Sequence, residues 1–493
     1  MKAYQALKEL FEKLSHLEHL QAIASWDEAV MMPSGGGNAR GRALSTLKST
    51  THELLTQEKT AELLADAKQE KLGNSWDIAN LKWMERAYTN ASCLPSNLVK
   101  SITEKSIEAE QAWRSLRAEN NWKDFAPYLE NTFKLVKESA TIRAEKFSKT
   151  PYDIMLDDFS PGIDQQFIDP IFSQLKKTLS PLIEQIIEKQ KTTHSIPLSG
   201  TFPIEQQRQL GLELMQAIGF DFNRGRLDVS HHPFCGGVPE DVRITTRYTD
   251  NEFVSSAMGT CHETGHAKYE QGLPKKWIDQ PVGRIHCMTM HESQSLLIEM
   301  QACRSIPFMN FVTPLVKRHF GEQEAFTAEN LYRLYTTVEP GLIRVDADEV
   351  TYPLHVIIRY ELEKALFSDS LTIADLPDAW NEKMQQYLGL STLNNDENGV
   401  MQDVHWPSGA FGYFPSYTLG SLTAAQLFQA AIKSNAAITE QLAFGNFSPL
   451  YEWLQSNVHS HASSKSFSNL MVDATGEALN PNYFIEHVKT RYL

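Results

Sequence analysis

Cysteine is scarce in this chain of 493 residues: there are five, an odd number, and no two of them form a C-x-x-C pair. A secreted scaffold held together by disulfides usually carries an even number of cysteines at close spacing. The scattered cysteines therefore predict free thiols in a reducing, cytoplasmic setting.

Long apolar runs and clustered positive charge are missing as well. No stretch of about 18 apolar residues could cross a membrane. The opening residues, MKAYQALKELFEKLSHLEHL, lack the apolar core of a signal peptide. The formal net charge is −15, and no long basic block offsets it. Because nucleic acids and anionic membranes attract clustered Lys and Arg, the sequence predicts neither as a partner.

Most of the chain shows apolar residues at the three-to-four spacing that is typical of helices. The clearest helical stretches are residues 7–26, 97–119, 128–147 and 168–190. Loops are expected where Gly, Pro, Ser and Asn gather, at Met32–Gly41, Thr192–Pro203 and Ser391–Gly399. No internal repeat or long linker separates independent domains.

One short segment, VRITTRY at Val242–Tyr248, breaks the helical pattern with a period of two. This period and the β-branched residues predict a strand with one buried face. The buried face would carry Val242, Ile244, Thr246 and Tyr248, and the other face Arg243, Thr245 and Arg247. Such a strand beside a cleft could pair with an extended peptide. The alternative is a small structural ribbon with surface arginines.

The segment CHETGHAKYEQGLP contains two histidines, His262 and His266, four residues apart. Residues four apart lie on one face of a helix, so the two imidazoles could bind one metal ion. Glu263 points about 100° away round the helix axis. From there it could act on a water molecule beside the metal. The alternative is a chance match, which a third ligand downstream would argue against.

The helix expected around this motif has a clear end. Gly272 followed by Pro274 is a helix stop signal. Gly265 lowers the helix propensity by about 1 kcal/mol relative to Ala. We expect it to be tolerated because it leaves space beside the metal.

A second acid-rich helix is expected at MHESQSLLIEMQACRS. Glu292 lies on its first turn and shares a face with Leu296 and Cys303, which predicts that it points toward packed protein. A buried carboxylate needs a partner, and a metal ion would supply one. Two histidines from one helix and a glutamate from a later helix form a known ligand set of catalytic zinc sites. Glu299 is expected to lie off this face. The alternative for Glu292 is an acid stabilised by the helix dipole.

Through these segments the sequence resembles the carboxypeptidase Taq family, the thermostable carboxypeptidase 1 group of metallocarboxypeptidases. Besides HETGH and HESQS, four more motifs of that family stand in the expected order: HPF at His232–Phe234, DVRIT at Asp241–Thr245, IRVDAD at Ile343–Asp348 and GVMQDVHW at Gly399–Trp406. The motifs cover the C-terminal two-thirds of the chain. The N-terminal third resembles the family through SWDEAVMMP and its general helicity.

The resemblance implies a mostly α-helical, elongated, two-lobed metallopeptidase with a deep central groove and a small β ribbon beside the HExxH helix. Neurolysin and angiotensin-converting enzyme are relatives of this fold. Residues 1–493 would form a single catalytic unit of two helical lobes. The N-terminal lobe would span roughly residues 1–220, and the metal site and the groove-lining motifs would lie in residues 228–420. Members of the family are usually homodimers.

The resemblance also implies that His262, His266 and Glu292 bind one divalent metal ion per chain, and that Glu263 is the general base. Zn²⁺ is favoured, with Co²⁺ and Mn²⁺ as alternatives, because this ligand set suits several divalent ions. The implied reaction is hydrolysis of the C-terminal peptide bond in peptides with a free C-terminus, with broad specificity.

Two other functions remain open. One is a dipeptidyl carboxypeptidase or oligopeptidase. The other is a non-catalytic binding protein that zinc stabilises. The intact Glu263 argues against the second, because a structural zinc site needs no base and is normally closed by a fourth ligand.

Peptide hydrolysis also needs hydrogen-bond donors for the developing oxyanion. The stretch HWPSGAFGYFPSYTLG offers His405, Tyr417 and Tyr413, in that order of preference. In the related helical peptidases a histidine and tyrosines of a comparable stretch have this role. For each tyrosine, core packing with a satisfied hydroxyl is the alternative.

A carboxypeptidase must bind a free carboxylate, for which an arginine fork is suited. Arg344 of IRVDAD is the first candidate, with Asp346 and Asp348 near it in sequence to orient it. Arg243 on the expected strand is the second, and a structural ion pair is the alternative for both. The motif matches add Asp241, Thr245 and His232 to the substrate-binding set; His232 is taken in preference to His231 because of its place in HPF.

Overall fold

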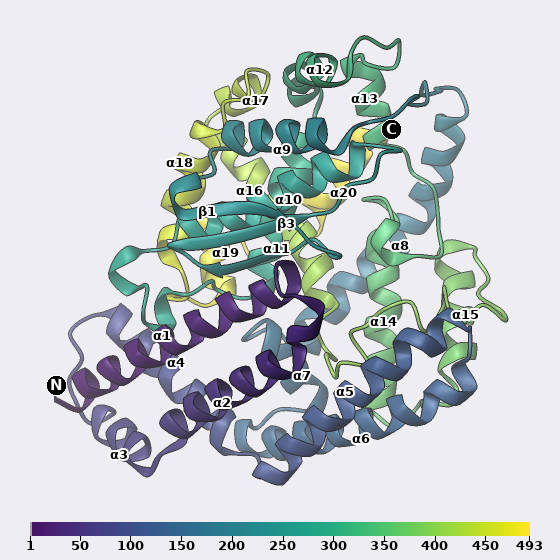
Figure 1. Cartoon of the computed structure of the whole chain (residues 1–493). Coiled ribbons are helices and arrows are strands. Elements are labelled where there is room, and N and C mark those ends of the chain that lie inside the picture. Colours follow the sequence, from purple (N-terminus) through teal and green to yellow (C-terminus); the bar gives the residue numbers. More distant parts are fainter. Residues whose placement is uncertain (1) are drawn as a thin grey trace.

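The computed structural model describes residues 2–493, which form many helices around one small β-sheet (Figure 1). The α-helices are α1 (Lys2–Val30), α2 (Gly37–Thr56), α3 (Glu58–Ala67), α4 (Ser75–Ser92), α5 (Ser96–Ala118), α6 (Trp122–Phe147), α7 (Pro151–Phe159), α8 (Gln165–Gln190), α9 (Ile204–Ile218), α10 (Val254–Gln271), α11 (Met288–Leu296), α12 (Ile306–Phe320), α13 (Ala328–Tyr335), α14 (Tyr352–Phe367), α15 (Leu376–Leu388), α16 (Pro415–Ser434), α17 (Ala437–Leu442), α18 (Ser448–Asn457), α19 (Phe467–Thr475) and α20 (Asn482–Tyr492). The strands are β1 (Gly225–Val229), β2 (Cys235–Val238) and β3 (Asp241–Thr246), and a π-helical turn, η5 (Leu297–Cys303), continues α11. The mostly helical fold with a small sheet is confirmed. Among the residues described, none of the helices combines the length and the apolar character needed to cross a membrane.

The four helices expected from apolar periodicity are present as α1, α5, α6 and α8. Two of the three expected loops contain neither helix nor strand: Thr192–Pro203 and Ser391–Gly399. The third, Met32–Gly41, is wrong in its second half, because α2 begins at Gly37. There Arg40 donates hydrogen bonds to the backbone oxygen of Ala24 and to Asp27, both on α1. Such tertiary contacts outweigh the low helix propensity of the glycines.

The sheet has the strand order β1-β3-β2, with β1 parallel and β2 antiparallel to β3. Val242 and Ile244 are buried, as the alternation predicts. Thr245 is buried as well, so the expectation that it lies on an open face is wrong. Its hydroxyl accepts hydrogen bonds from the Ser230 hydroxyl at 2.7 Å and from the backbone N–H of Phe234 at 3.0 Å. The segment between β1 and β2 thus covers this face of the strand.

The expected pairing of β3 with an extended peptide is also wrong. β3 is the central strand, and its two edges are taken by β1 and β2 along their whole lengths. A further chain therefore has no free ladder of N–H and C=O groups on β3 to pair with. The structural ribbon, which was the alternative, describes this strand.

The sheet supports α10, the helix that carries HExxH. Ala267 of α10 packs with Val242 and Ile244 in a small apolar cluster. In the view of Figure 1, α9 and α10 lie above the sheet and α1 lies below it. The main core is formed by residues from Phe125 onward, while α1, α3 and α4 share a smaller core of their own. The two-lobed outline stays a prediction.

The helices α10 and α11 approach each other closely at Gly265. A Cβ on Gly265 would lie 2.6 Å from the Cα of Ser295 and 2.7 Å from the backbone oxygen of Gln294. The expectation that Gly265 is tolerated for the space it leaves beside the metal is therefore wrong: the close approach of two helices requires it. Gly259, on the same helix, has no atom within 4 Å of such a Cβ.

This difference between two glycines of one helix can be tested. We expect Gly265→Ala to lower the free energy of unfolding by about 1–3 kcal/mol, because the added methyl group meets backbone atoms that cannot move alone. Gly259→Ala should be neutral or stabilising by up to about 1 kcal/mol, because alanine is the better helix former. Urea unfolding followed by circular dichroism measures both. Equal stability of the two variants would contradict the packing argument.

Candidate active site

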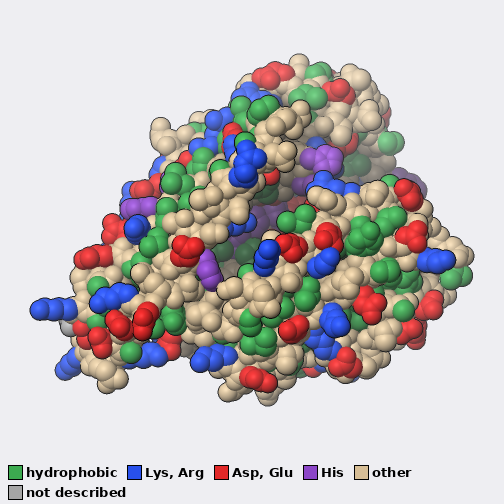
Figure 2. Space-filling view, turned by 60° about the horizontal axis from the view of Figure 1, so that its bottom comes forward, with side chains coloured by type: hydrophobic (Ala, Val, Ile, Leu, Met, Phe, Trp, Pro, Cys, Tyr) green, Lys and Arg blue, Asp and Glu red, His purple; other side chains and the backbone are tan. Residues whose placement is uncertain are grey.

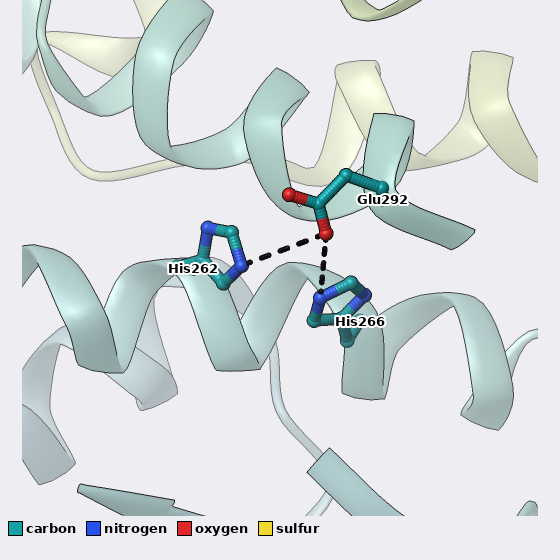
Figure 3. A group of neighbouring side chains, drawn as sticks. All are labelled: His262, His266 and Glu292. Carbon is teal, nitrogen blue, oxygen red and sulfur yellow. Dashed lines mark ion pairs between the residues drawn. The ribbon is translucent and has the colours of Figure 1, made fainter. Parts of the chain in front are cut away.

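His262 and His266 of α10 and Glu292 of α11 meet between the two helices (Figure 3). Their ligand atoms all lie within 4.8 Å of one another. Glu292 Oε2 is 3.9 Å from His262 Nε2 and 3.4 Å from His266 Nε2. The three residues that the sequence analysis grouped as ligands therefore come together in space.

The donor set of this cluster fits a divalent metal ion, since two imidazole nitrogens and a carboxylate oxygen are ligands of catalytic zinc sites. Burial raises the pKa of Glu292, but the hydrogen bond with His266 and the charges of the histidines lower it to about 2. Burial also lowers the pKa of His266 to about 3. An ionised carboxylate and a neutral imidazole are the forms that bind metal.

His262 differs from His266 in its electrostatic surroundings. Burial lowers its pKa, but the hydrogen bond with Glu299 and the charges of Glu292 and Glu299 raise it to about 10. A protonated imidazole has no free lone pair, so His262 would have to lose a proton before its Nε2 could bind a metal ion.

Glu299 is a residue of the site that the sequence analysis missed. Its Oε2 lies 2.9 Å from His262 Nδ1, and because an ionised carboxylate only accepts hydrogen bonds, His262 donates. This bond leaves Nε2 for the metal position. Glu299 follows Glu292 by about two helical turns, so both residues face α10. The expectation that Glu299 lies off this face is wrong, and the spacing was the signal that could have shown it.

Glu263 is only 7% exposed, and its Oε2 has no hydrogen-bond partner among the residues described. Burial raises its pKa to about 7, an effect that the charge of His262 opposes and that of Glu292 strengthens. A carboxyl group with such a pKa can exchange a proton near neutral pH.

Two further residues extend the site along α10, and the sequence analysis named neither. The ring of His291 stacks on that of His266, with 4.2 Å between centroids. His291 Nε2 lies 3.3 Å from Glu270 Oε1. Glu270 follows His266 by one helical turn on the same face of α10. The HES motif places His291 next to Glu292 in sequence, but no spacing rule predicts the stacking.

His405, Tyr413 and Tyr417 lie together at the beginning of α16, of which only Tyr417 is part. His405 Nε2 is 3.3 Å from the Tyr417 hydroxyl, and the two tyrosine rings are 5.1 Å apart. A Cβ on Gly420, one turn beyond Tyr417, would lie 2.8 Å from Glu292 Cγ. Besides burial, the charge of Glu292 contributes to raising the pKa of both Tyr413 and Tyr417, so these two side chains lie near the cluster. Burial lowers the pKa of His405 to about 4, so its ring is neutral.

Arg344 is buried and bonded, but not to the residues expected. Its Nε and Nη2 donate to Asp403 Oδ1 at 3.0 and 2.7 Å, and its Nη1 donates to the Tyr352 hydroxyl at 2.6 Å. The expectation that Asp346 and Asp348 orient it is therefore wrong. Asp348 instead accepts from Val350 and Thr351 at the start of α14. The chain brings Asp403 from the distant GVMQDVHW motif.

The remaining candidates lie on or near the sheet. Arg243 donates twice to Asp241, at 2.9 and 2.8 Å, and lies over the ring of Trp26 at 4.4 Å. Both oxygens of the Asp241 carboxylate therefore accept a hydrogen bond from Arg243, within β3 itself. Thr245 is buried among backbone partners, as described above. His232 is exposed, and its backbone oxygen accepts from Ser230.

These features have clear parallels in known proteins. Residues 6–492 match the model of the carboxypeptidase Taq (M32) metallopeptidase family, and the chain belongs to that family. It is a metal-dependent carboxypeptidase, a peptidase that takes a divalent metal ion. The alternative of a non-catalytic binding protein is thereby set aside.

Individual relatives match the chain over nearly its full length. It is 37% identical to thermostable carboxypeptidase 1 of Thermus thermophilus, with 99% of this chain and 98% of that protein covered. It is 35% identical to carboxypeptidase 1 of Bacillus subtilis, covering 98% and 97%. Among solved structures it resembles metallocarboxypeptidase 1 of Trypanosoma cruzi, with a TM-score of 0.98 and 41% identity over 100% and 99% of the two chains.

The buried pair of Arg344 and Asp403 gives a test of stability. Arg359 also bonds Asp403, from Nε to Oδ2 at 2.6 Å, so Asp403→Asn would leave two buried arginines without their carboxylate. We expect a loss of about 3–5 kcal/mol in the free energy of unfolding. Asp369→Asn is the control, because Asp369 pairs with Lys137 at the surface with 85% of its side chain exposed. It should change stability by less than about 1 kcal/mol. Equal losses in the two urea unfolding curves would refute the buried network.

Proposed function

We propose that this enzyme removes single C-terminal residues, with broad specificity, from peptides that have a free C-terminus. The observation that carries the proposal is the cluster of His262, His266 and Glu292 beside the unpartnered carboxylate of Glu263. A structural metal site has no use for such a carboxylate.

The metal ion would be held by His262 Nε2, His266 Nε2 and Glu292 Oε2, one ion per chain. Zn²⁺ is favoured, with Co²⁺ and Mn²⁺ as alternatives. When bound, the ion polarises the scissile carbonyl and lowers the pKa of a water molecule toward 7.

Glu263 is the general base in this proposal. Its Oε2 takes the proton of the attacking water and passes it to the nitrogen of the leaving residue. Two features support this role. The oxygen has no hydrogen-bond partner in the described part of the chain, and the carboxyl stands next to His262 in sequence while pointing to a different side of α10.

Tyr417 and His405 would donate hydrogen bonds to the oxygen on which negative charge develops, with Tyr413 next in order. Preorganised donors at this point contribute strongly to catalysis. The hydroxyl of Tyr417 and Nε2 of His405 are neighbours at 3.3 Å, and, besides burial, the charge of Glu292 contributes to raising the pKa of Tyr417.

Arg344 would bind the free carboxylate of the substrate. A guanidinium has five N–H donors, and Asp403 and Tyr352 take three of them, which leaves two for a ligand. Arg344 and Arg359 carry two positive charges around the single negative charge of Asp403. One positive charge is left over, and a substrate carboxylate would balance it. Arg243 is the second candidate, with Asp241, Thr245 and His232 as supporting residues near the substrate.

The larger arrangement follows from the family resemblance. We propose one catalytic unit of two helical lobes, the first spanning roughly residues 1–220, around a groove lined by residues 228–420. The space-filling view shows a hollow on one face with histidine side chains inside it, which supports a groove at the metal site (Figure 2). The separate core of α1, α3 and α4 supports an N-terminal lobe. A homodimer in the cytoplasm completes the proposal.

The first test separates a carboxypeptidase from an enzyme that releases dipeptides or cuts internally. We expect mass spectrometry to find single amino acids released from free peptides, and little cleavage of the matching C-terminal amides. Arg344→Ala should lower kcat/KM for the free peptide by the equivalent of about 2–5 kcal/mol and leave that for the amide almost unchanged. Arg243→Ala is the comparison. If only Arg243→Ala changes the ratio of free peptide to amide, Arg243 binds the carboxylate instead.

The second test concerns the base. Glu263→Gln keeps the shape of the side chain but cannot take a proton. We expect kcat to fall by about 10²–10⁴-fold, with the metal content of the purified protein unchanged. Metal analysis and turnover are measured on the same sample. Loss of the metal in this variant would show that Glu263 supports the ligands and is not the base.

A further inference from the structure

The helix that carries Glu292 does not continue as a regular α-helix. Residues Leu297–Cys303 form the π-helical turn η5. The backbone N–H of Arg304 donates to the backbone oxygen of Glu299 at 3.0 Å, a hydrogen bond between residues five apart. π-helical turns are rare and occur frequently at functional sites.

This turn brings together two side chains that an α-helix would separate. In an α-helix, residues five apart point about 140° away from each other. In η5, Arg304 Nη2 instead donates to Glu299 Oε1 at 2.5 Å. The other oxygen, Oε2, accepts from His262 Nδ1 at 2.9 Å. Each oxygen of Glu299 therefore has one charged or polar partner, and one of these partners is a residue of the metal cluster.

Arg304 is itself held by the element that contacts the start of α10. Its Nη1 donates to the backbone oxygen of Tyr335 at 3.2 Å. The Tyr335 hydroxyl donates to the backbone oxygen of Val254, the first residue of α10, also at 3.2 Å. A series of hydrogen bonds thus connects two points of α10. It leads from Val254 through Tyr335, Arg304 and Glu299 to His262.

We propose that Arg304 is a positioning residue of the metal site, which fixes Glu299 and, through Glu299, the tautomer and ring orientation of His262. The inference rests on the proposed role of His262 as a metal ligand. Without the guanidinium, the Glu299 carboxylate loses its fixed partner and can turn away from Nδ1. The ring then has no group that holds Nε2 toward Glu292. Loss of such outer partners weakens metal affinity by about 10–100-fold.

The test measures metal affinity on the full chain, with activity as a separate readout. The Kd of Zn²⁺ is obtained by competition with a chelator, and the visible absorption of the Co²⁺ form reports the ligand geometry. We expect Arg304→Met and Glu299→Gln each to raise the Kd by about 10-fold or more. Arg304→Lys should recover part of the loss, because an ammonium group still pairs with Glu299.

A control variant separates positioning from general stability. Arg143 pairs with Asp158 and is buried to a similar extent, with 11% of its side chain exposed against 17% for Arg304. Arg143→Met therefore removes a comparable ion pair, one that joins α6 to α7. It should lower the melting temperature. The Kd of Zn²⁺ should stay within about twofold of the wild type, because Arg143 contacts neither the proposed ligands nor Glu299, and the folded protein would bind the metal as before.

The decisive comparison is the double variant. If Arg304 acts through Glu299, Arg304→Met should change the Kd little when Glu299→Gln is already present. Fully additive effects, or an unchanged Kd in Arg304→Met alone, would overturn the inference. If Arg304→Met does not fold, Arg304→Lys in the two Glu299 backgrounds gives the same comparison. His266→Ala serves as the check on the site itself: an unchanged Kd there would overturn the proposed ligands and not only the role of Arg304.

Discussion

The close contact between α10 and α11 at Gly265 is the constraint on which the metal site depends. Only with these backbones in contact can Glu292 reach both imidazoles of the neighbouring helix. A second glycine has the same role on the opposite side, since a Cβ on Gly420 would meet Glu292 Cγ at 2.8 Å. Glu292 is thus confined between two helices that approach it closely. The proposed ligands stand on helices and not on loops, an arrangement that favours a precise site.

Burial of charge explains which of the carboxylates near the site are structural and which can react. Glu299 is neutralised by Arg304, and Asp403 by Arg344 and Arg359. Glu263 is also buried, yet within residues 2–493 its Oε2 has no hydrogen-bond partner. An unpaired buried carboxylate is destabilising unless it takes up a proton. The carboxyl that the fold leaves unsatisfied is therefore the one suited to proton transfer.

The sequence predicted those parts of the site that depend on spacing within one helix or on a continuous motif. His262 and His266 share a face because they are four residues apart, and the motif added Glu292. The sequence did not predict partners that come from distant segments, such as Asp403 for Arg344. The helix packing at Gly265 was missed because it depends on how α10 and α11 approach each other. Glu299 was missed although its spacing of seven residues from Glu292 could have shown it. The four helices expected from apolar periodicity are present, whereas α2 begins inside an expected loop, where Arg40 bonds α1.

The rigidity of the arginine network bears on how an exopeptidase selects its bond. An enzyme that cleaves the last peptide bond must place that bond at the metal whenever the terminal carboxylate is bound. The group that binds this carboxylate must therefore keep a constant distance from the metal. Arg344 meets this requirement better than a surface arginine would, because three hydrogen bonds hold its guanidinium and the ring of Tyr417 lies beneath it at 5.0 Å. Tyr417 in turn pairs with His405 and lies one turn from Gly420, which contacts Glu292. Arg344, the proposed carboxylate anchor, and Glu292, the proposed metal ligand, are thus connected through packed residues of α16. Such packing would keep the two groups at a constant separation, and a bound peptide would then present the same bond to the metal each time.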